Sequence, residues 1–186
     1  MDTTTEPSPR LSESQKVFEC PWFHVHAERW EHLPEGDQPP FFRIDSPDGV
    51  LVLALTRHGD IILVRQYRHA IRRMTLELPA GSVEKGESHK QAASRELFEE
   101  TGFRAGSFRL LGGGHLMGNR FNARDSLWLA QDCERTLSEK TGQSPDIRLV
   151  SGREFKGLVV SGAFEQFPAL ALFSLVEWQL GLRIVG

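Results

Sequence analysis

Cysteine is scarce in this sequence, with only Cys20 and Cys133 among 186 residues. Two cysteines are too few for a disulfide framework and lack metal-ligand spacing, so we expect ordinary reduced thiols. An excess of charge of either sign is also missing. The sequence has 22 Lys and Arg and 25 Asp and Glu, which gives a formal net charge of −3. Together with 39% hydrophobic residues, this balance argues against a basic nucleic-acid scaffold and against an acidic disordered chain.

Long hydrophobic runs are missing as well. Residues 1–15 are polar, rich in Thr, Ser, Pro and Glu, and hold no apolar run of the kind found in signal peptides or membrane anchors. We therefore expect a disordered tail at 1–15 in a cytoplasmic protein, with neither nucleic acid nor membrane as a partner. The length is close to that of one ordinary domain.

Short apolar runs separated by turn residues predict a series of strands. Residues 23–28 alternate apolar and polar side chains, which is the pattern of a half-buried strand. The apolar runs 50–55 and 61–67 flank the turn 58–60 and predict a hairpin. Further strands are expected at residues 41–44, 75–78, 108–111, 126–130 and 147–150.

Helical signals are concentrated in three places. Residues 88–101 contain no Gly or Pro, and Gly102 follows where a C-terminal cap would stand, so this stretch predicts a helix. Pro168 precedes a second helical stretch at 169–180, and a shorter helix is expected at 154–160. Strands interleaved with helices predict an α/β fold in which a mixed sheet is packed between helices.

Three carboxylates gather on the first of these helices. At 100° per residue, Glu96, Glu99 and Glu100 fall within an arc of about 100°. Two interpretations are open. A solvated acidic face explains such a stripe, and so does a site for Mg²⁺ or Mn²⁺, which favour carboxylates together with substrate phosphate oxygens.

Spacing around the stripe decides between the two. Residues 81–103 read G-x5-E-x7-R-E-U-x-E-E-x-G-U, where U is a bulky apolar residue. This stretch resembles the Nudix hydrolase box at every specified position, a match expected by chance in about one in a million sequences of this composition. By this resemblance the fold is a Nudix-type α/β/α sandwich with a mixed sheet, and the box forms a loop and helix that bind divalent metal.

The resemblance also implies roles for individual residues. The metal ligands would be the backbone carbonyl of Ala80 and the carboxylates of Glu96, Glu99 and Glu100. They would hold two or three Mg²⁺ ions, with Mn²⁺ as an alternative. Glu87 and Arg95 would orient the loop and the ligands, although in some relatives the residue at Glu87 contacts the metal through water.

Sequence outside the box resembles the branch of ADP-ribose and nucleoside-diphosphate-sugar pyrophosphatases. The similarity lies in V-R-Q-Y-R at 64–68 and T-L-E-L-P-A-G at 75–81. In that branch the arginine matching Arg68 contacts the diphosphate, and the glutamate matching Glu77 contacts the nucleoside side. A local basic run of Arg65, Arg68, Arg72 and Arg73 suits an anionic substrate. Solvated charges at a strand edge are the alternative, above all for Arg72 and Arg73.

Residues 16–45 precede the expected Nudix domain at 46–186 and resemble the strands that this branch exchanges between the subunits of a homodimer. An aromatic pair sandwiches the base there, and Trp22 with Phe41 or Phe42 occupies the comparable position. Core packing is the alternative for these aromatic residues. Met117, in the segment 115–120, is included among the expected substrate-binding residues.

The segment after the box differs from the pattern of ADP-ribose enzymes at two places. Gly118 stands where ADP-ribose enzymes usually carry proline, and the acidic residue a few places later is replaced within 121–124. We therefore expect either a sugar nucleotide such as GDP-mannose or a broad range that includes ADP-ribose.

The general base in this branch is often a glutamate on the loop between the last strands. Glu134, Glu139 and Asp146 are candidates here, and Glu139 is favoured by its position in the loop. His89 and His115 are minor candidates.

The sequence therefore predicts a Mg²⁺-dependent pyrophosphohydrolase that cleaves nucleoside diphosphate sugars to a nucleoside monophosphate and a sugar phosphate. Two alternatives are a non-catalytic module that binds such nucleotides, and a Nudix enzyme acting on NADH, dinucleoside polyphosphates or RNA caps.

Overall fold

The computed structural model of the protein describes residues 8–33, 40–136 and 146–184. Its contacts divide the chain into two compact units. We call Met1–Pro47 with His115–Ala123 the strand unit, and Asp48–Gly114 with Arg124–Gly186 the sandwich unit. The predicted boundary between residues 45 and 46 lies close to the division at Pro47, whereas the inclusion of His115–Ala123 in the strand unit had no signal in the sequence.

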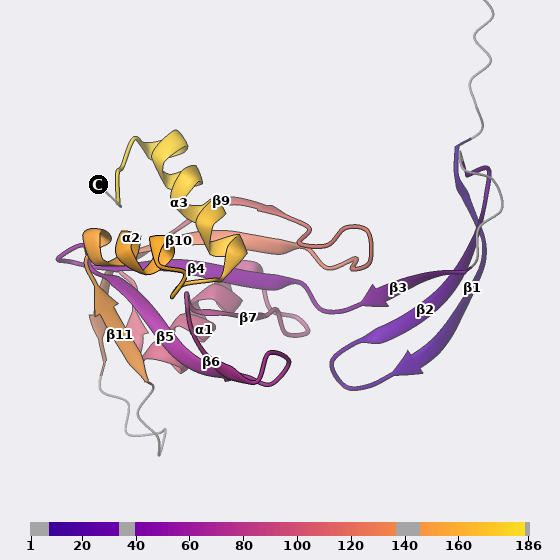
Figure 1. Ribbon diagram of the computed structural model, residues 1–186, viewed down its shortest axis with the longest axis horizontal. Coiled ribbons are helices and arrows are strands. Elements are labelled where there is room, and N and C mark those ends of the chain that lie inside the picture. The colour runs from indigo at the N-terminus through magenta and orange to yellow at the C-terminus, as the bar shows by residue number, and fades with distance from the viewer. Residues whose placement is uncertain (1–7, 34–39, 137–145, 185–186) are drawn as a thin grey trace, which may run out of the picture. The chain divides into compact units, whose positions relative to one another are not determined.

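Three antiparallel strands, drawn in indigo and violet in Figure 1, form most of the strand unit. They are β1 (Arg10–Glu19), β2 (His24–Glu31) and β3 (Phe41–Asp45), paired in the order β1-β2-β3. Strand β1 includes residues 10–15, which the sequence analysis assigned to the tail, while residues 1–7 lie outside the described residues. All side chains of β1 are exposed, and backbone pairing with β2 and cross-strand ion pairs such as Arg10 with Glu31 hold it in place.

Backbone hydrogen bonds attach the segment 115–123 to β3. The Ile44 amide donates to the Arg120 carbonyl at 2.7 Å, and the Asn122 amide donates to the Ile44 carbonyl at 3.3 Å. The Arg120 guanidinium lies 4.5 Å from the centre of the Phe41 ring, which is within the range of a cation–π contact. A segment distant in sequence thereby completes this unit.

The sandwich unit is built on an eight-stranded sheet. Its elements are β4 (Gly49–Thr56), β5 (Ile61–Arg68), β6 (Arg73–Glu77), β7 (Ala80–Ser82), α1 (His89–Thr101), β8 (Phe103–Arg104), β9 (Ser107–Gly114), β10 (Asp125–Arg135), β11 (Ile147–Val150), α2 (Gly152–Val160) and α3 (Phe167–Leu180). The main path runs β11-β5-β4-β10-β8, and β6, β7 and β9 pair with β5, β4 and β10 respectively. Strands β4 and β10 are parallel and the remaining pairs are antiparallel, so the sheet is mixed.

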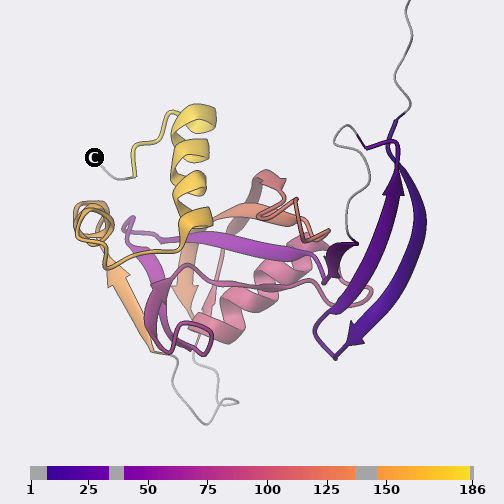
Figure 2. The ribbon, with the colours of Figure 1, turned by 45° about the vertical axis from the view of Figure 1, so that its right-hand side comes forward.

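Strand β4 carries the core on both of its faces. By alternation, Val50 and Val52 point to one face and Leu51 and Leu53 to the other, and all four are buried. The first pair packs in a cluster with α1, and the second in a cluster with α2 and α3. Helices thus cover both faces of the sheet (Figure 2), which confirms the predicted α/β/α sandwich.

Helix α1 begins and ends where its local signals predict. The Ser88 side chain accepts from the Gln91 amide, and Gln91 bonds back to Ser88, which forms a capping box. Gly102 has φ 72°, in the left-handed region, and its amide donates to the Phe98 carbonyl at 2.8 Å.

The predicted hairpin of residues 50–55 and 61–67 forms only at its turn. Strands β4 and β5 are in register at Leu55 and Ile61. Beyond that pair, β4 bonds to β7 and β10, while β5 bonds to β6 and β11. Partners distant in sequence therefore separate two strands that the local pattern joins.

Helices α2 and α3 confirm the two other predicted helices, with α2 starting two residues earlier than expected, after its N-cap Ser151. Within the described residues, no helix is both long and apolar enough to cross a membrane.

Candidate active site

The acidic stripe of α1 lies against the short strand β7. The carboxylates of Glu96 and Glu100 are half-buried, whereas that of Glu99 is exposed. A Cβ atom at Gly81 would overlap the Glu96 carboxylate. Glycine at this position therefore lets the backbone of β7 approach the helix closely.

Arg95 is the centre of the ion pairs around this stripe. Its Nε and Nη2 each donate to the Glu87 carboxylate at 3.0 Å, and Nη2 also donates to the Ser82 carbonyl at 2.8 Å. Its Nη1 donates to Glu96 at 2.8 Å and to Glu99 at 3.1 Å. Hydrogen bonds from Arg95 hold the pKa of Glu87 below its ordinary value, and the same bonds raise the pKa of Arg95. The predicted pairing of Glu87 with Arg95 is present, and it fastens the loop 82–87 to the helix.

Glu100 is held from two sides. The side-chain amide of Gln66 on β5 donates to Oε1 at 2.5 Å, and the backbone amide of Ala80 donates to Oε2 at 3.0 Å. Burial raises the pKa of Glu100 and also that of Glu96. A half-buried carboxylate of this kind gains more from a bound cation than an exposed one does, because the cation offsets the cost of desolvation.

The donor set fits a divalent cation of the hard type. Three carboxylates and the adjoining backbone of Ala80 present oxygen atoms, which Mg²⁺ and Mn²⁺ prefer. The close approach allowed by Gly81 places the backbone of β7 beside two of these carboxylates, Glu96 and Glu100. In the described part of the chain, no three His, Cys, Asp or Glu side chains are already arranged as a metal site. Arg95 forms ion pairs with Glu96 and Glu99 there.

Arg68 and Glu77, both predicted to contact substrate, bind each other. Arg68 Nε donates to Glu77 Oε1 at 2.7 Å, a second bond joins Nη2 to Oε2, and the Thr75 hydroxyl donates to Oε1 at 2.6 Å. Burial alone would raise the pKa of Glu77, but these hydrogen bonds outweigh it and lower the pKa overall. The Glu77 bonds raise the pKa of Arg68, and the charge of Glu100 acts in the same direction. The pair therefore lies within the electrostatic reach of the acidic stripe.

Arg65 lies apart from this group. Alternation along β5 places its side chain on the opposite face of the strand from Gln66 and Arg68. Its guanidinium is 3.4 Å from the Asp146 carboxylate. The structure therefore does not bring Arg65 together with the other candidate substrate contacts of the sandwich unit.

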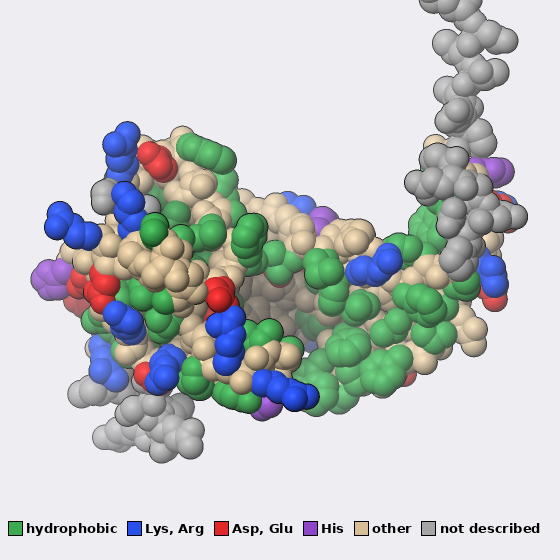
Figure 3. Space-filling view, viewed as in Figure 1, with side chains coloured by type: hydrophobic (Ala, Val, Ile, Leu, Met, Phe, Trp, Pro, Cys, Tyr) green, Lys and Arg blue, Asp and Glu red, His purple; other side chains and the backbone are tan. Residues whose placement is uncertain are grey.

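The candidate aromatic residues of the strand unit are exposed. The exposed fractions are 74% for Trp22, 37% for Phe41, 51% for Phe42 and 51% for Met117. Within one chain these aromatic side chains are not packed in a core. The alternative interpretation of the aromatic pair is therefore wrong for the single chain. Figure 3 shows hydrophobic side chains gathered over the surface of this unit.

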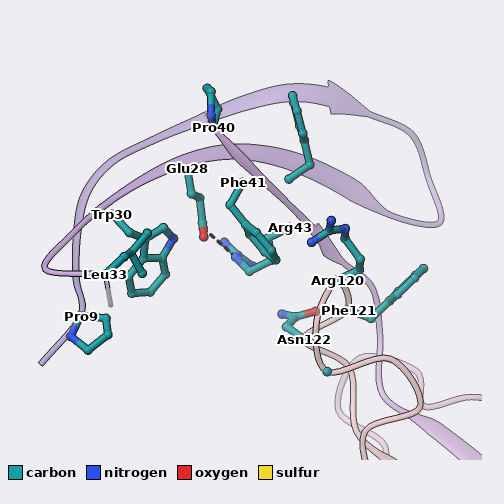
Figure 4. Close-up of a pocket in the computed structure, with 12 residues that line it drawn as sticks. Pro9, Glu28, Trp30, Leu33, Pro40, Phe41, Arg43, Arg120, Phe121 and Asn122 are labelled. Atoms are coloured by element: carbon teal, nitrogen blue, oxygen red, sulfur yellow. Dashed lines mark hydrogen bonds and ion pairs between the residues drawn. The ribbon is translucent and has the colours of Figure 1, made fainter. Parts of the chain in front are cut away.

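A cavity of about 700 Å³ opens within the strand unit (Figure 4). Aromatic and charged side chains line it together, among them Trp30, Phe41, Phe42, Phe121, Arg43 and Glu28. Glu28 is only 2% exposed, and Arg43 Nε donates to its Oε1 at 2.7 Å. The ion pair with Arg43 compensates the negative charge of the buried Glu28 carboxylate.

The other sequence candidates have different positions. Glu139 lies outside the described residues, Glu134 pairs with Arg57 at 2.7 Å, and Asp146 pairs with Arg65. His89 Nδ1 lies 2.9 Å from the Ser126 hydroxyl, and His115 Nδ1 lies 2.9 Å from the Ala123 carbonyl.

Cys133 is buried, and burial raises the pKa of its thiol to about 12. A thiol of this kind stays protonated at neutral pH and is a poor nucleophile.

Sequence reasoning missed Gln66 and Thr75. Alternation along β5 was the available signal, because Gln66 and Arg68 are two residues apart and share a face. Thr75 is opposite Gln66 in the ladder of β5 and β6, and no local pattern revealed that register.

Known proteins are similar to this chain over part of its length. An ADP-ribose pyrophosphatase of Bacillus subtilis (strain 168) is 45% identical over 91 residues, which cover 49% of this chain and 49% of that protein. A methanol dehydrogenase activator of Bacillus methanolicus is 41% identical over 71 residues, covering 38% of each. The matches thus span about half or less of these curated relatives.

A solved structure described as that of an ADP compounds hydrolase has the same fold. It superposes with a TM-score of 0.81 over 96% of this chain and 97% of its own, at 21% sequence identity. The model of the NUDIX domain family matches residues 45–151, which include β4, the acidic helix α1 and the Arg68–Glu77 pair. The chain belongs to the NUDIX domain family.

Proposed function

We propose that the protein is a Mg²⁺-dependent pyrophosphohydrolase that cleaves a nucleoside diphosphate sugar to a nucleoside monophosphate and a sugar phosphate. The observation that carries this proposal is the pair of half-buried carboxylates, Glu96 and Glu100, held against β7 beside Gly81 and Ala80. Similarity to a relative described as an ADP-ribose pyrophosphatase supports a nucleotide sugar as the substrate class. ADP-ribose and GDP-mannose are the first two candidates.

Each residue of the sandwich unit has a distinct role in this proposal. Glu96 and Glu100, assisted by Glu99 and the Ala80 carbonyl, hold the divalent ions. When bound, such ions neutralise the diphosphate and lower the pKa of a coordinated water, which makes hydrolysis possible at neutral pH. Arg95 keeps Glu96 and the loop 82–87 in place.

Arg68 supplies a planar donor pair that suits a phosphate group. In the substrate-free protein these donors are engaged by Glu77. Substrate phosphate replaces part of this pairing, and the freed Glu77 carboxylate accepts hydrogen bonds from the nucleoside side. Glu139 remains the candidate base, and Trp22, Phe42 and Met117 remain candidates for substrate contact.

We also propose that the protein is a homodimer formed through the strand unit. In the described part of that unit no apolar side chain is buried, while aromatic side chains such as Trp22 and Phe42 are exposed. A three-stranded sheet without a buried apolar face is not stable in isolation, and large exposed apolar patches mark interfaces.

The test of the catalytic proposal is hydrolysis of a panel of nucleotides with Mg²⁺ or Mn²⁺. The panel includes ADP-ribose, GDP-mannose, UDP-glucose, NADH and diadenosine polyphosphates, and release of monophosphate is measured. Glu100→Gln should lower turnover by at least about 100-fold, since even outer partners of metal ligands contribute 10–100-fold.

The matched control is Glu177→Gln, at an exposed position of α3, which should retain activity. Circular dichroism and thermal unfolding should show that both variants are folded. No monophosphate from any member of the panel, or full activity in Glu100→Gln, would contradict the proposal and favour the alternative of a binding module.

A further inference from the structure

Gln66 makes a direct contact with a candidate metal ligand although it lies outside the Nudix box. Its Nε2 donates to Glu100 Oε1 at 2.5 Å, across 34 residues of sequence. On the other side of the same carboxylate, the Ala80 amide donates to Oε2 at 3.0 Å. The two donors come from different strands, so together they fix the rotation of the carboxylate as well as its position.

Gln66 is itself held in place by the sheet. It lies opposite Thr75 in the ladder of β5 and β6, within the paired segment that runs from Val64 to Arg68 on β5. A side chain on a paired strand is more precisely oriented than one on a loop.

The chemistry of the amide suits this position. Each oxygen of an ionised carboxylate has two acceptor sites, so one hydrogen bond to each oxygen leaves capacity on both for a cation. The amide is neutral and leaves the negative charge of Glu100 intact. Arg95 differs in this respect, because its guanidinium partly neutralises Glu96 and Glu99.

We propose that Gln66 is a positioning residue that holds the Glu100 carboxylate in the orientation in which it binds the divalent ion. This inference rests on the proposed function, since it assumes that Glu100 is a metal ligand. It assigns Gln66 to the metal site and not to the substrate, although Gln66 shares a strand face with Arg68.

The test is a titration of substrate-free protein with Mn²⁺, in which electron paramagnetic resonance measures the free ion. Gln66→Met keeps the length of the side chain and removes the donor. We expect Mn²⁺ affinity to fall 10–100-fold, the range typical of partners that orient metal ligands. The matched control is Gln131→Met, at a half-buried glutamine on β10, and its Mn²⁺ affinity should equal that of the unmodified protein.

Two further measurements separate positioning from other roles. Without metal, the melting temperature of Gln66→Met should stay within about 4 °C of the unmodified protein, the shift expected for loss of about 1 kcal/mol. In hydrolysis assays kcat at low Mn²⁺ should fall while KM for the nucleotide stays the same, and added Mn²⁺ should restore kcat.

Each contrary result has a defined meaning. An unchanged Mn²⁺ affinity with a raised KM would overturn the inference in favour of substrate contact, and an unchanged affinity with a lower melting temperature would assign Gln66 a purely structural role. If Gln66→Met does not fold, Gln66→Asn retracts the amide by one methylene and should give the same loss of affinity. Absence of Mn²⁺ binding in the unmodified protein would refute the proposed function itself.

Discussion

The Arg68 guanidinium on β5 donates two hydrogen bonds to the Glu77 carboxylate on β6, and the bond from Nε to Oε1 measures 2.7 Å. Paired geometry of this kind is stronger than a single contact. The two residues are not directly opposite each other, since Glu77 is in register with Val64 and Arg68 with Arg73. The pair therefore runs diagonally across the hairpin and ties its two strands together.

Stability in acid should depend on Glu77. Its pKa is below the ordinary value, so its ionised form stabilises the fold above the pKa of the unfolded chain. That contribution is lost as the pH falls through the lowered pKa of the folded chain. We expect Glu77→Gln to cost about 1–2 kcal/mol at pH 7, after allowance for the partial exposure of Arg68, and to cost nothing in strong acid.

Thermal unfolding from pH 7 down to pH 3 measures this difference. Glu177→Gln, at an exposed site, should differ little from the unmodified protein at any pH. Coincident curves for Glu77→Gln and the unmodified protein would show that the pair does not stabilise the fold.

Gly81 should not tolerate a side chain. Since a Cβ there would overlap the Glu96 carboxylate, Gly81→Ala must displace either that side chain or β7. We expect at least about a 10-fold loss of turnover and of Mn²⁺ affinity, because misplacement of a ligand by 1 Å is costly.

The control for this change is Gly157→Ala on α2, where nothing lies within 4 Å of an added Cβ. That variant should keep full activity and gain up to about 1 kcal/mol of stability, because alanine favours a helix interior. Equal activity in both variants would contradict the importance of the close approach of β7 to Glu96.

Arg95 should require its planar guanidinium. Arg95→Lys keeps the positive charge, but one ammonium cannot make the bonds to Glu87, Glu96 and the Ser82 carbonyl together. We expect kcat to fall about 10–100-fold.

Release of the loop 82–87 in Arg95→Lys should also speed trypsin cleavage after Lys85, which is exposed. An exposed arginine on α2 provides the control Arg153→Lys, which should alter neither rate, and a normal kcat in Arg95→Lys would refute the positioning role.

Local signals were sufficient for the helix that carries the site. The start of α1 at Ser88 and its end at Gly102 depend on hydrogen bonds within a few residues. Glu96 and Glu100 share one face of α1 because they are four residues apart on a helix. These features could therefore be predicted from a short window of sequence.

Contacts between distant segments could not be predicted in that way. Strand β1 has no buried side chain, and pairing with β2 holds it in place. The hydrogen bond of Gln66 to Glu100 and the pairing of Arg68 with Glu77 depend on how β5, β6 and α1 meet, which is set by the register of the sheet and its core. The family resemblance supplied roles for Arg68 and Glu77 but not their mutual contact.

The strand unit should hold two copies of the chain together. Its described residues bury no apolar side chain, while Phe42 is 51% exposed, so covering this face by a second copy removes apolar area from water. Phe42→Asp places a charge on that face, and we expect the dissociation constant of the dimer to rise at least about 10-fold, as for a central aromatic contact.

Light scattering coupled to size-exclusion chromatography measures the mass of the protein over a dilution series. Val160→Asp, at an exposed apolar site on α2 in the sandwich unit, is the control and should remain dimeric. An unmodified protein that is monomeric at tens of micromolar, or equal dissociation of both variants, would rule out the strand unit as the interface.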